Sequence, residues 1–190
     1  MKLILASASP RRRQLMEQIG LTFEVMPSNV DEDDIVGHDP LMNIQAIALH
    51  KARAVAARLE DGIVIGADTQ ILMDGEILGK PSDEADAARM LLKLSGRTHR
   101  AITGVALVDA STHVEETWVE TTLVTFRELL ESEISAYVDT GEPMGKAGAY
   151  GIQGRAAAFV EKIEGCYFNV VGLPLAKLVQ NLKKWSGRKK

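Results

Sequence analysis

The sequence predicts an α/β fold that is built on a mixed β-sheet. Helical and strand-like patterns alternate along the 190 residues, with no internal repeat and no low-complexity stretch. The continuous apolar run Ile63–Ala67 has the length and composition of a buried strand. Asp74-Gly75 separates two short apolar segments, 70–73 and 76–78, and this pattern is typical of a β-hairpin. Because hairpins interrupt the helical crossovers, we expect both parallel and antiparallel strand pairs.

Composition and charge narrow the class of protein. With 46% hydrophobic and 25% charged residues the chain is an ordinary globular protein, and we expect residues 1–190 to form one domain of two lobes that share a sheet. The net charge of −4 argues against a protein that coats nucleic acid. Cys166 is the only cysteine, which excludes an intrachain disulfide and predicts a reducing compartment. No apolar run reaches the length of roughly 18 residues that a membrane span needs, so we expect a cytoplasmic protein without a membrane partner.

The first helix is expected to begin at Ser9-Pro10, after a short strand over residues 2–5. Serine is a favourable N-cap, and proline suits the first helical position. The apolar face of this helix consists of Leu15, Met16 and Ile19. Gly20 predicts the C-terminal end of the helix.

Three consecutive arginines, Arg11–Arg13, occupy the N-terminus of this helix. A helix N-terminus carries about half a positive charge and a set of unpaired N–H groups, so added guanidinium groups are unfavourable unless an anion binds there. The small polar segment 6–9 before the helix completes a suitable anion site. We interpret residues 1–13 as a cradle for a polyphosphate. The alternative is a solvated arginine cluster that only aids solubility.

The remaining elements are predicted from caps, glycines and apolar periods. Up to residue 96 we expect a strand at 22–26, an acidic loop at 31–34, a long helix from Asp39-Pro40 to near Gly62, and a helix from Ser82 to Gly96. Further along we expect strands at 100–108 and 117–126 joined by a turn around Ser111, and a short helix at 134–138. The last elements are a hairpin of 157–163 with 167–171 across Glu164-Gly165, and a final helix after Pro174.

A lysine lies on the apolar face of the long helix. Lys51 follows Ile44 by seven residues, so it falls on the stripe that also contains Ile47 and Val55. Its ammonium group could extend past the apolar surface to reach water. Alternatively, it could point into a cleft and hold an anion. Both interpretations stay open at this point.

Several charged residues combine into a pattern typical of metal-assisted phosphate-ester hydrolysis. Asp68 directly follows the predicted strand 63–67, and the carboxyl ends of strands often carry functional residues in α/β folds. Lys80 follows the hairpin, and Glu32 lies in the acidic loop. Carboxylates can hold a hard divalent cation, while lysines and arginines can hold phosphate. The histidines lack the spacing of zinc ligands, and the phosphate-binding loop of P-loop enzymes is absent from the sequence.

Eight short motifs occur in order over nearly the whole chain. They are LASASPRR (5–12), VDE (30–32), KA (51–52), GADT (66–69), GKP (79–81), LSG (94–96), KAGAYGIQG (146–154) and VGLP (171–174). Together they closely resemble the motifs of the Maf family of nucleoside triphosphate pyrophosphatases. The resemblance implies a Maf/inosine-triphosphatase-like fold, which is an elongated mixed sheet flanked by helices with a cleft between two lobes. It also implies a cytoplasmic homodimer and a divalent metal cofactor, Mg²⁺ or Mn²⁺.

The resemblance further implies hydrolysis of a nucleoside triphosphate between its α and β phosphates, and it assigns roles to single residues. The implied catalytic residues are Glu32, Lys51, Asp68 and Lys80. The implied substrate-binding residues are Ser7, Arg11, Arg12, Thr69 and Gln153. Asp68 matches the proton acceptor that activates water, and Glu32 and Asp68 match the metal ligands. Arg13 has no motif counterpart, so we expect it to be a surface charge.

Thr69 and Gln153, together with Arg12, resemble the subgroup that acts on dTTP and UTP. A carboxamide offers a donor and an acceptor, which match the N3–H and carbonyl edge of uracil or thymine. A carboxylate would instead suit the cationic ring of 7-methylguanine. The alternative is that Gln153 only bridges backbone groups within its glycine-rich loop.

Two other functions are weighed against a dTTP and UTP pyrophosphatase. The first is the same chemistry on 7-methyl-GTP. The second is a non-enzymatic regulator of septum formation, since the family is also linked to inhibition of that process. The set of Glu32, Lys51, Asp68 and Lys80 argues against regulation as the only role, because a protein that only binds partners needs no such site.

Overall fold

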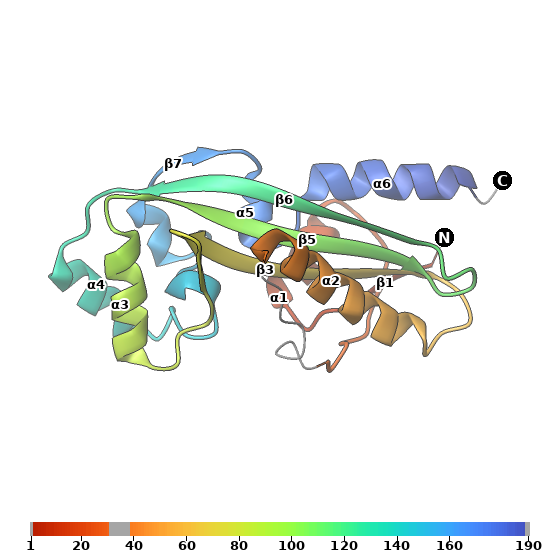
Figure 1. The fold of residues 1–190 in the computed structure, drawn as a ribbon, viewed down its shortest axis with the longest axis horizontal. Coiled ribbons are helices and arrows are strands. Elements are labelled where there is room, and N and C mark those ends of the chain that lie inside the picture. The colour runs from red at the N-terminus through yellow and green to blue at the C-terminus, as the bar shows by residue number, and fades with distance from the viewer. Residues whose placement is uncertain (1, 31–38, 189–190) are drawn as a thin grey trace. The chain divides into compact units, whose positions relative to one another are not determined.

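The structure confirms the α/β class and the mixed sheet. It is a computed structural model that describes residues 2–30 and 39–188. Within these ranges, seven strands form one sheet in the order β2-β1-β3-β5-β6-β7, and β4 pairs with β3 beside this path (Figure 1). The strands are β1 Leu3–Leu5, β2 Glu24–Val25, β3 Ile63–Met73, β4 Glu76–Leu78, β5 Thr98–Asp109, β6 Glu115–Phe126 and β7 Val160–Glu164. Strand β1 is parallel to β2 and β3, whereas the pairs β3–β4 and β6–β7 are antiparallel.

Helices connect most of the strands. The α-helices are α1 Pro10–Gln18, α2 Pro40–Ala56, α3 Glu84–Leu94, α4 Glu131–Val138, α5 Tyr167–Val171 and α6 Leu175–Arg188. Two short 3₁₀ helices are η1 Ala147–Ala149 and η2 Arg155–Phe159. None of the helices in the described ranges combines the length and apolar character that crossing a membrane requires.

The chain divides into two compact units. Unit 1 consists of Met1–Asp68, Thr103–Glu120 and Gly172–Lys190, and unit 2 consists of Thr69–Ile102 and Thr121–Val171. Strands β3, β5 and β6 each contribute residues to both units.

The core of unit 1 is built from small and β-branched side chains. One buried cluster joins the inner face of α2 to β1, β3 and β5, and its members are Ile4, Ala6, Ala48, Ala52, Val55, Ala56, Val64, Ala106, Val108 and Ala110. This confirms the apolar stripe predicted for the long helix. Asp39 caps α2 as predicted, since its carboxylate accepts a hydrogen bond from the Leu41 N–H at 2.8 Å.

The core of unit 2 contains a cluster of aromatic rings. The ring of Phe126 lies edge-on to His99 and to Tyr150, with centroid distances of 5.0 and 4.9 Å. Phe159 packs in the same way on Tyr137 at 5.1 Å. The imidazole Nε2 of His99 and the hydroxyl of Tyr150 form a buried hydrogen bond of 2.8 Å. This bond ties β5 to the segment that follows η1.

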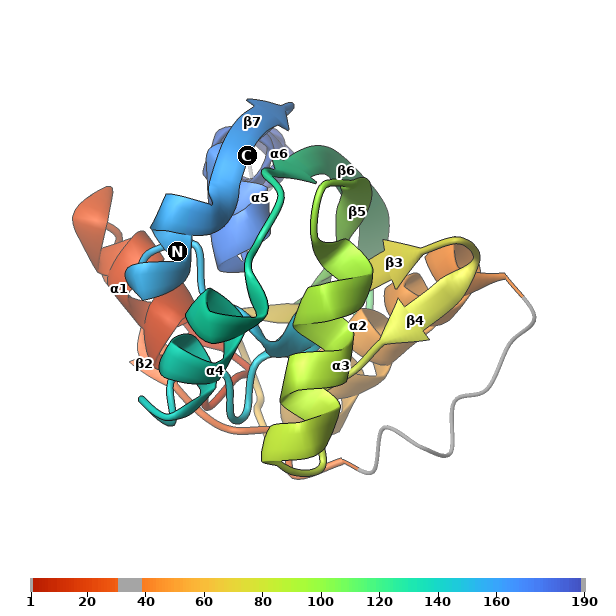
Figure 2. The ribbon, with the colours of Figure 1, turned by 90° about the vertical axis from the view of Figure 1, so that its left-hand side faces the viewer.

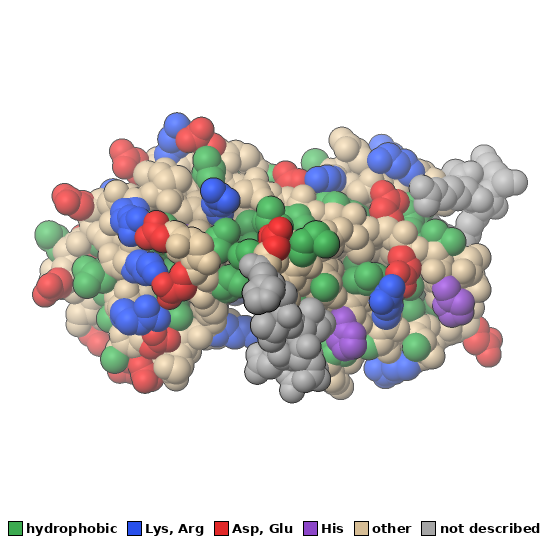
Figure 3. Space-filling model, viewed as in Figure 1, with side chains coloured by type: hydrophobic (Ala, Val, Ile, Leu, Met, Phe, Trp, Pro, Cys, Tyr) green, Lys and Arg blue, Asp and Glu red, His purple; other side chains and the backbone are tan. Residues whose placement is uncertain are grey.

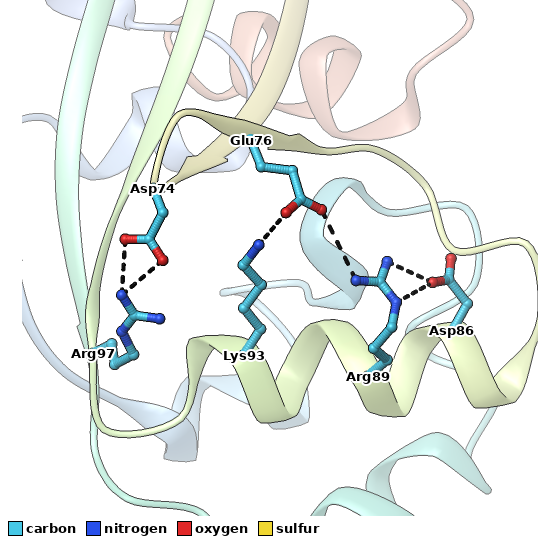
Figure 4. Close-up of polar contacts among 6 residues, drawn as sticks. All are labelled: Asp74, Glu76, Asp86, Arg89, Lys93 and Arg97. Atoms are coloured by element: carbon cyan, nitrogen blue, oxygen red, sulfur yellow. Dashed lines mark hydrogen bonds and ion pairs between the residues drawn. The ribbon is translucent and has the colours of Figure 1, made fainter.

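A network of ion pairs joins the β3–β4 hairpin to α3, and α3 in turn packs against α4 (Figure 2). The ion-pair network consists of Asp74, Glu76, Asp86, Arg89, Lys93 and Arg97 (Figure 4). One guanidinium nitrogen of Arg97 lies 2.8 Å from both carboxylate oxygens of Asp74. Figure 3 shows side chains of both signs next to one another over this helix. Because these groups are largely exposed, the pairs set the orientation of the hairpin more than they add to stability.

Strand β3 is longer than predicted. The sequence suggested that the buried strand ends at Ala67, but β3 continues to Met73 and therefore includes Asp68 and Thr69. Ile71 to Met73 pair with β4 across the Asp74-Gly75 turn, and both turn residues have positive φ angles of 53° and 80°. The predicted hairpin is thus correct, but its first arm is the end of the same strand.

Several local predictions were wrong. Helix α2 ends at Ala56 and not near Gly62, and residues 157–159 belong to η2 instead of the predicted strand, which begins only at Val160. Residues 167–171 form helix α5 instead of a strand, because the buried Asn169 donates hydrogen bonds of 3.0 Å to the Ala101 carbonyl and the Thr122 hydroxyl. Asp83 rather than Ser82 caps α3, since its carboxylate accepts from the Asp86 N–H at 2.7 Å. Ile19 lies after α1 and is exposed, whereas the predicted partners Leu15 and Met16 are buried.

The buried His99 makes stability depend on pH. Burial lowers the pKa of His99 from 6.5 to about 4, so its stabilising effect is complete above pH 6.5 and is lost as the pH falls toward 4. We expect this group to lower the free energy of unfolding by about 3 kcal/mol across that interval. Urea unfolding at a series of pH values measures the slope. In His99→Gln, which retains a polar group facing Tyr150 but cannot titrate, that part of the slope should disappear. Equal slopes in the two proteins would contradict the assignment.

Candidate active site

In unit 1, two neighbouring parallel strands bring two predicted segments together. Leu5 of β1 pairs with Ile65 of β3, and the Ala6 N–H donates a hydrogen bond of 2.8 Å to the Ile65 carbonyl. The chain beyond β1 therefore runs beside the part of β3 that leads to Asp68. Ser7 thus lies just beyond the carboxyl end of β1, beside the middle of β3, where Asp68 is located.

Lys51 and Asp68 form a buried ion pair. The ammonium nitrogen of Lys51 lies 2.8 Å from Oδ1 of Asp68, and the two residues are 7% and 9% exposed. The interpretation that Lys51 extends past the apolar surface to water is therefore wrong. The anion that it holds in this structure is a carboxylate of the chain itself. Buried charges are normally paired in this way.

Two glycines allow α2 to approach the sheet closely enough for this pair to form. A Cβ atom on Gly66 of β3 would lie 2.2 Å from the carbonyl oxygen of Ala48 and 2.9 Å from the Ala52 side chain. On β5, a Cβ atom on Gly104 would lie 2.3 Å from the carbonyl oxygen of Ile44. The helix backbone thus rests directly on the strand backbones. Lys51 lies next to Ala52, at the contact with Gly66, from where it reaches Asp68 two residues further along β3.

Arg12 is buried and oriented by neighbours in unit 1. Its Nε donates to the carbonyl oxygen of Gly172 at 2.9 Å, and Nη1 donates to the hydroxyl of Ser7 at 3.1 Å. The same hydroxyl accepts a hydrogen bond from the Ser9 N–H. Ser9 is the N-cap of α1, as predicted, but its side chain makes no capping hydrogen bond. The predicted cradle therefore has an ordered guanidinium group beside a helix N-terminus that its N-cap side chain leaves open.

The other two arginines of the cluster differ from each other. Arg13 is exposed and pairs with Glu17 at 2.7 Å, which confirms that it is a surface charge. Arg11 is half-buried, and burial lowers the pKa of its guanidinium group. It makes no hydrogen bond or ion pair with the residues that the structure describes. A cation under a desolvation penalty at a helix N-terminus is a favourable site for an anion.

The remaining predicted site residues within the described ranges make none of the contacts described above for Lys51, Asp68 and Arg12. Thr69 is half-buried on β3, and Lys80 is exposed just after β4, both in unit 2. Gln153 is exposed on the segment between η1 and η2. The Gly148 N–H donates a hydrogen bond of 2.9 Å to the Gly79 carbonyl, which links that segment to the residue before Lys80. Glu32 lies outside the described residues.

The described part of the chain contains no cluster of three or more His, Cys, Asp or Glu side chains suited to a metal ion. Asp68 is the one predicted metal ligand within it. Mg²⁺ characteristically binds through one or two carboxylates, with water and substrate phosphates completing its shell. A single buried carboxylate beside a phosphate cradle fits a cation that binds together with its substrate.

Sequence reasoning missed the residues that hold the site in place. Gly172 holds Arg12 through its carbonyl, Gly104 packs against α2 at Ile44, and Glu142 and His99 support the segment that carries Gln153. The only sequence signal for the close packing at Gly66 was a glycine inside a buried strand, which often marks close approach of another backbone.

Comparison with known proteins shows the family of this chain. Residues 2–185 match the family described as "Maf-like protein". A dTTP/UTP pyrophosphatase of Pelotomaculum thermopropionicum is 53% identical over 184 residues, covering 97% of this chain and 96% of the relative. A dTTP/UTP pyrophosphatase of Moorella thermoacetica is 55% identical over 181 residues, or 95% and 93% of the two chains. Among solved structures, the Ham1 protein of Staphylococcus aureus is 16% identical with a TM-score of 0.47, over 66% of this chain and 72% of that one.

The close packing of α2 can be tested at Gly66. In Gly66→Ala the added methyl group would overlap the Ala48 carbonyl, a backbone atom that cannot move without displacing the helix. We expect the free energy of unfolding at pH 7 to fall by about 1–3 kcal/mol, as measured by urea titration. The control is Gly79→Ala, because a Cβ atom there has no neighbour within 4 Å. Its stability should change by less than about 0.5 kcal/mol. Equal stability of the two variants would contradict the close contact.

Proposed function

This chain belongs to the Maf-like protein family, and we propose that it hydrolyses dTTP and UTP to the nucleoside monophosphate and pyrophosphate. The structural observation that carries the proposal is the buried Lys51–Asp68 pair. Asp68 lies in the part of β3 beside the segment that follows β1, and that segment carries Ser7, which accepts a hydrogen bond from Arg12. The proposal is supported by relatives that are more than 50% identical over almost the whole chain and are named dTTP/UTP pyrophosphatases.

The triphosphate binds to the cradle at the N-terminus of α1. Arg12 offers a planar guanidinium group whose orientation is already set by Ser7 and Gly172. Arg11 and the N–H groups of the helix N-terminus add positive charge and hydrogen-bond donors. Lys80 supplies a further ammonium group for the phosphate chain. Such prearranged charges stabilise the negative charge that accumulates in the transition state of phosphoryl transfer.

Asp68 acts as the general base. Its carboxylate accepts a proton from the attacking water as the α–β phosphoanhydride bond breaks and pyrophosphate leaves. Lys51 orients this carboxylate through their 2.8 Å contact. A divalent cation, Mg²⁺ or Mn²⁺, would be held by Asp68 and Glu32 and would neutralise charge on the phosphate oxygens when bound.

Gln153 and Thr69 recognise the base. Gln153 is exposed and can present both its amide donor and its carbonyl acceptor to the N3–H and carbonyl edge of uracil or thymine. Thr69 follows Asp68 on β3 and is half-buried. The proposal also describes a cytoplasmic homodimer that acts on free nucleotides, and not on nucleic acid or at a membrane. The single cysteine and the net charge of −4 support the compartment and the choice of nucleotides over nucleic acid.

The role of Asp68 is tested by Asp68→Asn, which preserves size but removes the proton acceptor. We expect kcat/KM for dTTP and UTP to fall by about 10²–10⁴-fold, measured as pyrophosphate release with Mg²⁺ or Mn²⁺. The fold should persist, as judged by a cooperative thermal transition. Asp139→Asn, at an exposed position after α4, is the matched control and should retain full activity. Near-normal turnover in Asp68→Asn would remove this residue from the mechanism. If the unmodified protein released no pyrophosphate from any nucleotide, a non-enzymatic regulator would be the better interpretation.

The role of Gln153 is tested by Gln153→Glu. A carboxylate cannot donate a hydrogen bond to a uracil carbonyl, but it attracts the cationic ring of 7-methylguanine. We expect the ratio of kcat/KM for UTP to that for 7-methyl-GTP to fall by at least about tenfold. Gln180→Glu makes the same chemical change at an exposed position of α6 and should leave the ratio unaltered. An unchanged ratio in Gln153→Glu would mean that the residue does not read the base. Activity confined to 7-methyl-GTP in the unmodified protein would overturn the proposed substrate.

A further inference from the structure

Gln153 lies on a tight turn whose two central side chains face opposite environments. The Gly154 N–H donates a hydrogen bond of 2.9 Å to the Gly151 carbonyl and closes the turn. Ile152 is 7% exposed and anchors the turn in unit 2, whereas Gln153 is exposed. No hydrogen bond of the Gln153 side chain to a described residue holds it in place. The direction in which Gln153 points is therefore determined by the backbone of the turn.

The chain is held firmly where it enters this turn. Tyr150 is 5% exposed, and its hydroxyl is within 2.8 Å of His99 Nε2. The next residue, Gly151, donates its N–H to the hydroxyl of Tyr137 at 3.3 Å. Two tyrosines from different parts of unit 2 thus hold the first residues of the turn.

The chain is held where it leaves the turn by Glu142. Its Oε2 accepts a hydrogen bond of 3.1 Å from the Arg155 N–H. Its Oε1 accepts one of 3.0 Å from the hydroxyl of Tyr137, the group that also receives the Gly151 N–H. One carboxylate therefore connects the exit of the turn directly, and its entrance through Tyr137. Hydrogen bonds to an ionised acceptor are stronger than those between neutral groups.

The carboxylate of Glu142 also lies against the backbone of the turn. A Cβ atom on Gly154 would come within 2.1 Å of Glu142 Oε1, so a residue with a side chain cannot occupy that position without displacing the carboxylate. Glu142 is itself held from two sides. Its N–H donates to the Thr140 hydroxyl at 3.1 Å, and its carbonyl oxygen accepts from the Lys146 ammonium group.

We propose that Glu142 is the positioning residue for recognition of the base: it fixes the turn 151–155 and so determines where Gln153 meets the nucleotide. It acts through the turn and does not touch the substrate. The claim that Glu142 affects recognition of the base rests on the proposed function. The claim that Glu142 fixes the turn 151–155 concerns the free protein alone.

The hold on the turn is measured by amide hydrogen exchange of the free protein. In Glu142→Ala, exchange of the amides of Gly151, Gly154 and Arg155 should become at least about tenfold faster, while the rest of unit 2 keeps its protection. Glu142→Gln retains an acceptor oxygen for the Arg155 N–H, so it should restore most of the protection. The control Glu161→Ala removes an exposed carboxylate from β7 and should not alter exchange in the turn. Unchanged exchange in Glu142→Ala would overturn the proposal.

The consequence for the base is measured by kinetics with UTP and 7-methyl-GTP. Glu142→Ala should reduce the preference for UTP by about the same factor as Gln153→Ala, chiefly through KM. The double variant should show no further loss of preference, because both substitutions remove the same interaction. Glu142→Gln should recover most of the preference for UTP, and Glu161→Ala should show the same preference as the unmodified protein.

Two results would contradict the positioning role. Equal loss of kcat for both nucleotides, with the preference unchanged, would mean that Glu142 only supports the fold. Additive losses of preference in the double variant would mean that Glu142 and Gln153 act separately. An unmodified protein that hydrolysed neither nucleotide would overturn the proposed function and the reading of the base. Even then, the exchange experiment would decide whether Glu142 holds the turn.

Discussion

The part of unit 1 that contains Lys51 and Asp68 depends on the direct contact between the backbone of α2 and the backbones of β3 and β5. Gly66 and Gly104 permit that contact, since a methyl group at either position would overlap a carbonyl oxygen of the helix. The short distance explains why the core between these layers consists largely of alanine and valine. It also brings a lysine on the inner face of a helix to a carboxylate on the neighbouring strand, with no room for intervening water. In a tightly packed interior such a distance cannot be adjusted gradually, so the ion pair and the alanine-rich core have the same origin.

Burial of the Lys51–Asp68 pair is better explained by chemistry than by stability. Removing two charges from water costs free energy that their attraction only partly restores, and apolar residues of similar size often stabilise a fold as well or better. In the proposed mechanism Asp68 is the proton acceptor, and its carboxylate has to be correctly oriented before the substrate arrives. The 2.8 Å contact with Lys51 provides that orientation. The ion pairs of Glu76 with Arg89 and Lys93 on α3 differ in kind, because their side chains are more exposed and such pairs add little to stability.

The general plan of the fold could be predicted from local chemistry. Apolar periods located α2, the Asp74-Gly75 turn located the hairpin, and Asp39 was recognised as a cap. Prediction failed where tertiary contacts outweigh local preference. The β-branched and aromatic segment 167–171 would favour a strand in isolation, but hydrogen bonds from Asn169 to Ala101 and Thr122 hold it as a helix. The charged residues proposed for the site were likewise selected from their motifs. The groups that position them were not, because the carbonyl of Gly172 and the carboxylate of Glu142 belong to segments far away in the sequence or show no distinctive pattern.

The groups proposed to act in the two units are of opposite kinds. In unit 1, Arg12, Lys51 and Asp68 are buried, and each is oriented by hydrogen bonds of its own side chain. In unit 2, Lys80 and Gln153 are exposed, and their placement comes from the backbone around them: Gly148 bonds to Gly79, and Glu142 holds Arg155. The difference follows from the chemistry required of each group. In the proposed mechanism the base Asp68 needs a fixed orientation, which its pairing with Lys51 provides. A residue that reads a nucleobase has to release its water and form new hydrogen bonds on every turnover, so its donor and acceptor have to stay accessible. A rigid backbone under an accessible side chain meets both requirements, because it limits the entropy lost on binding without occupying the polar atoms that the base needs.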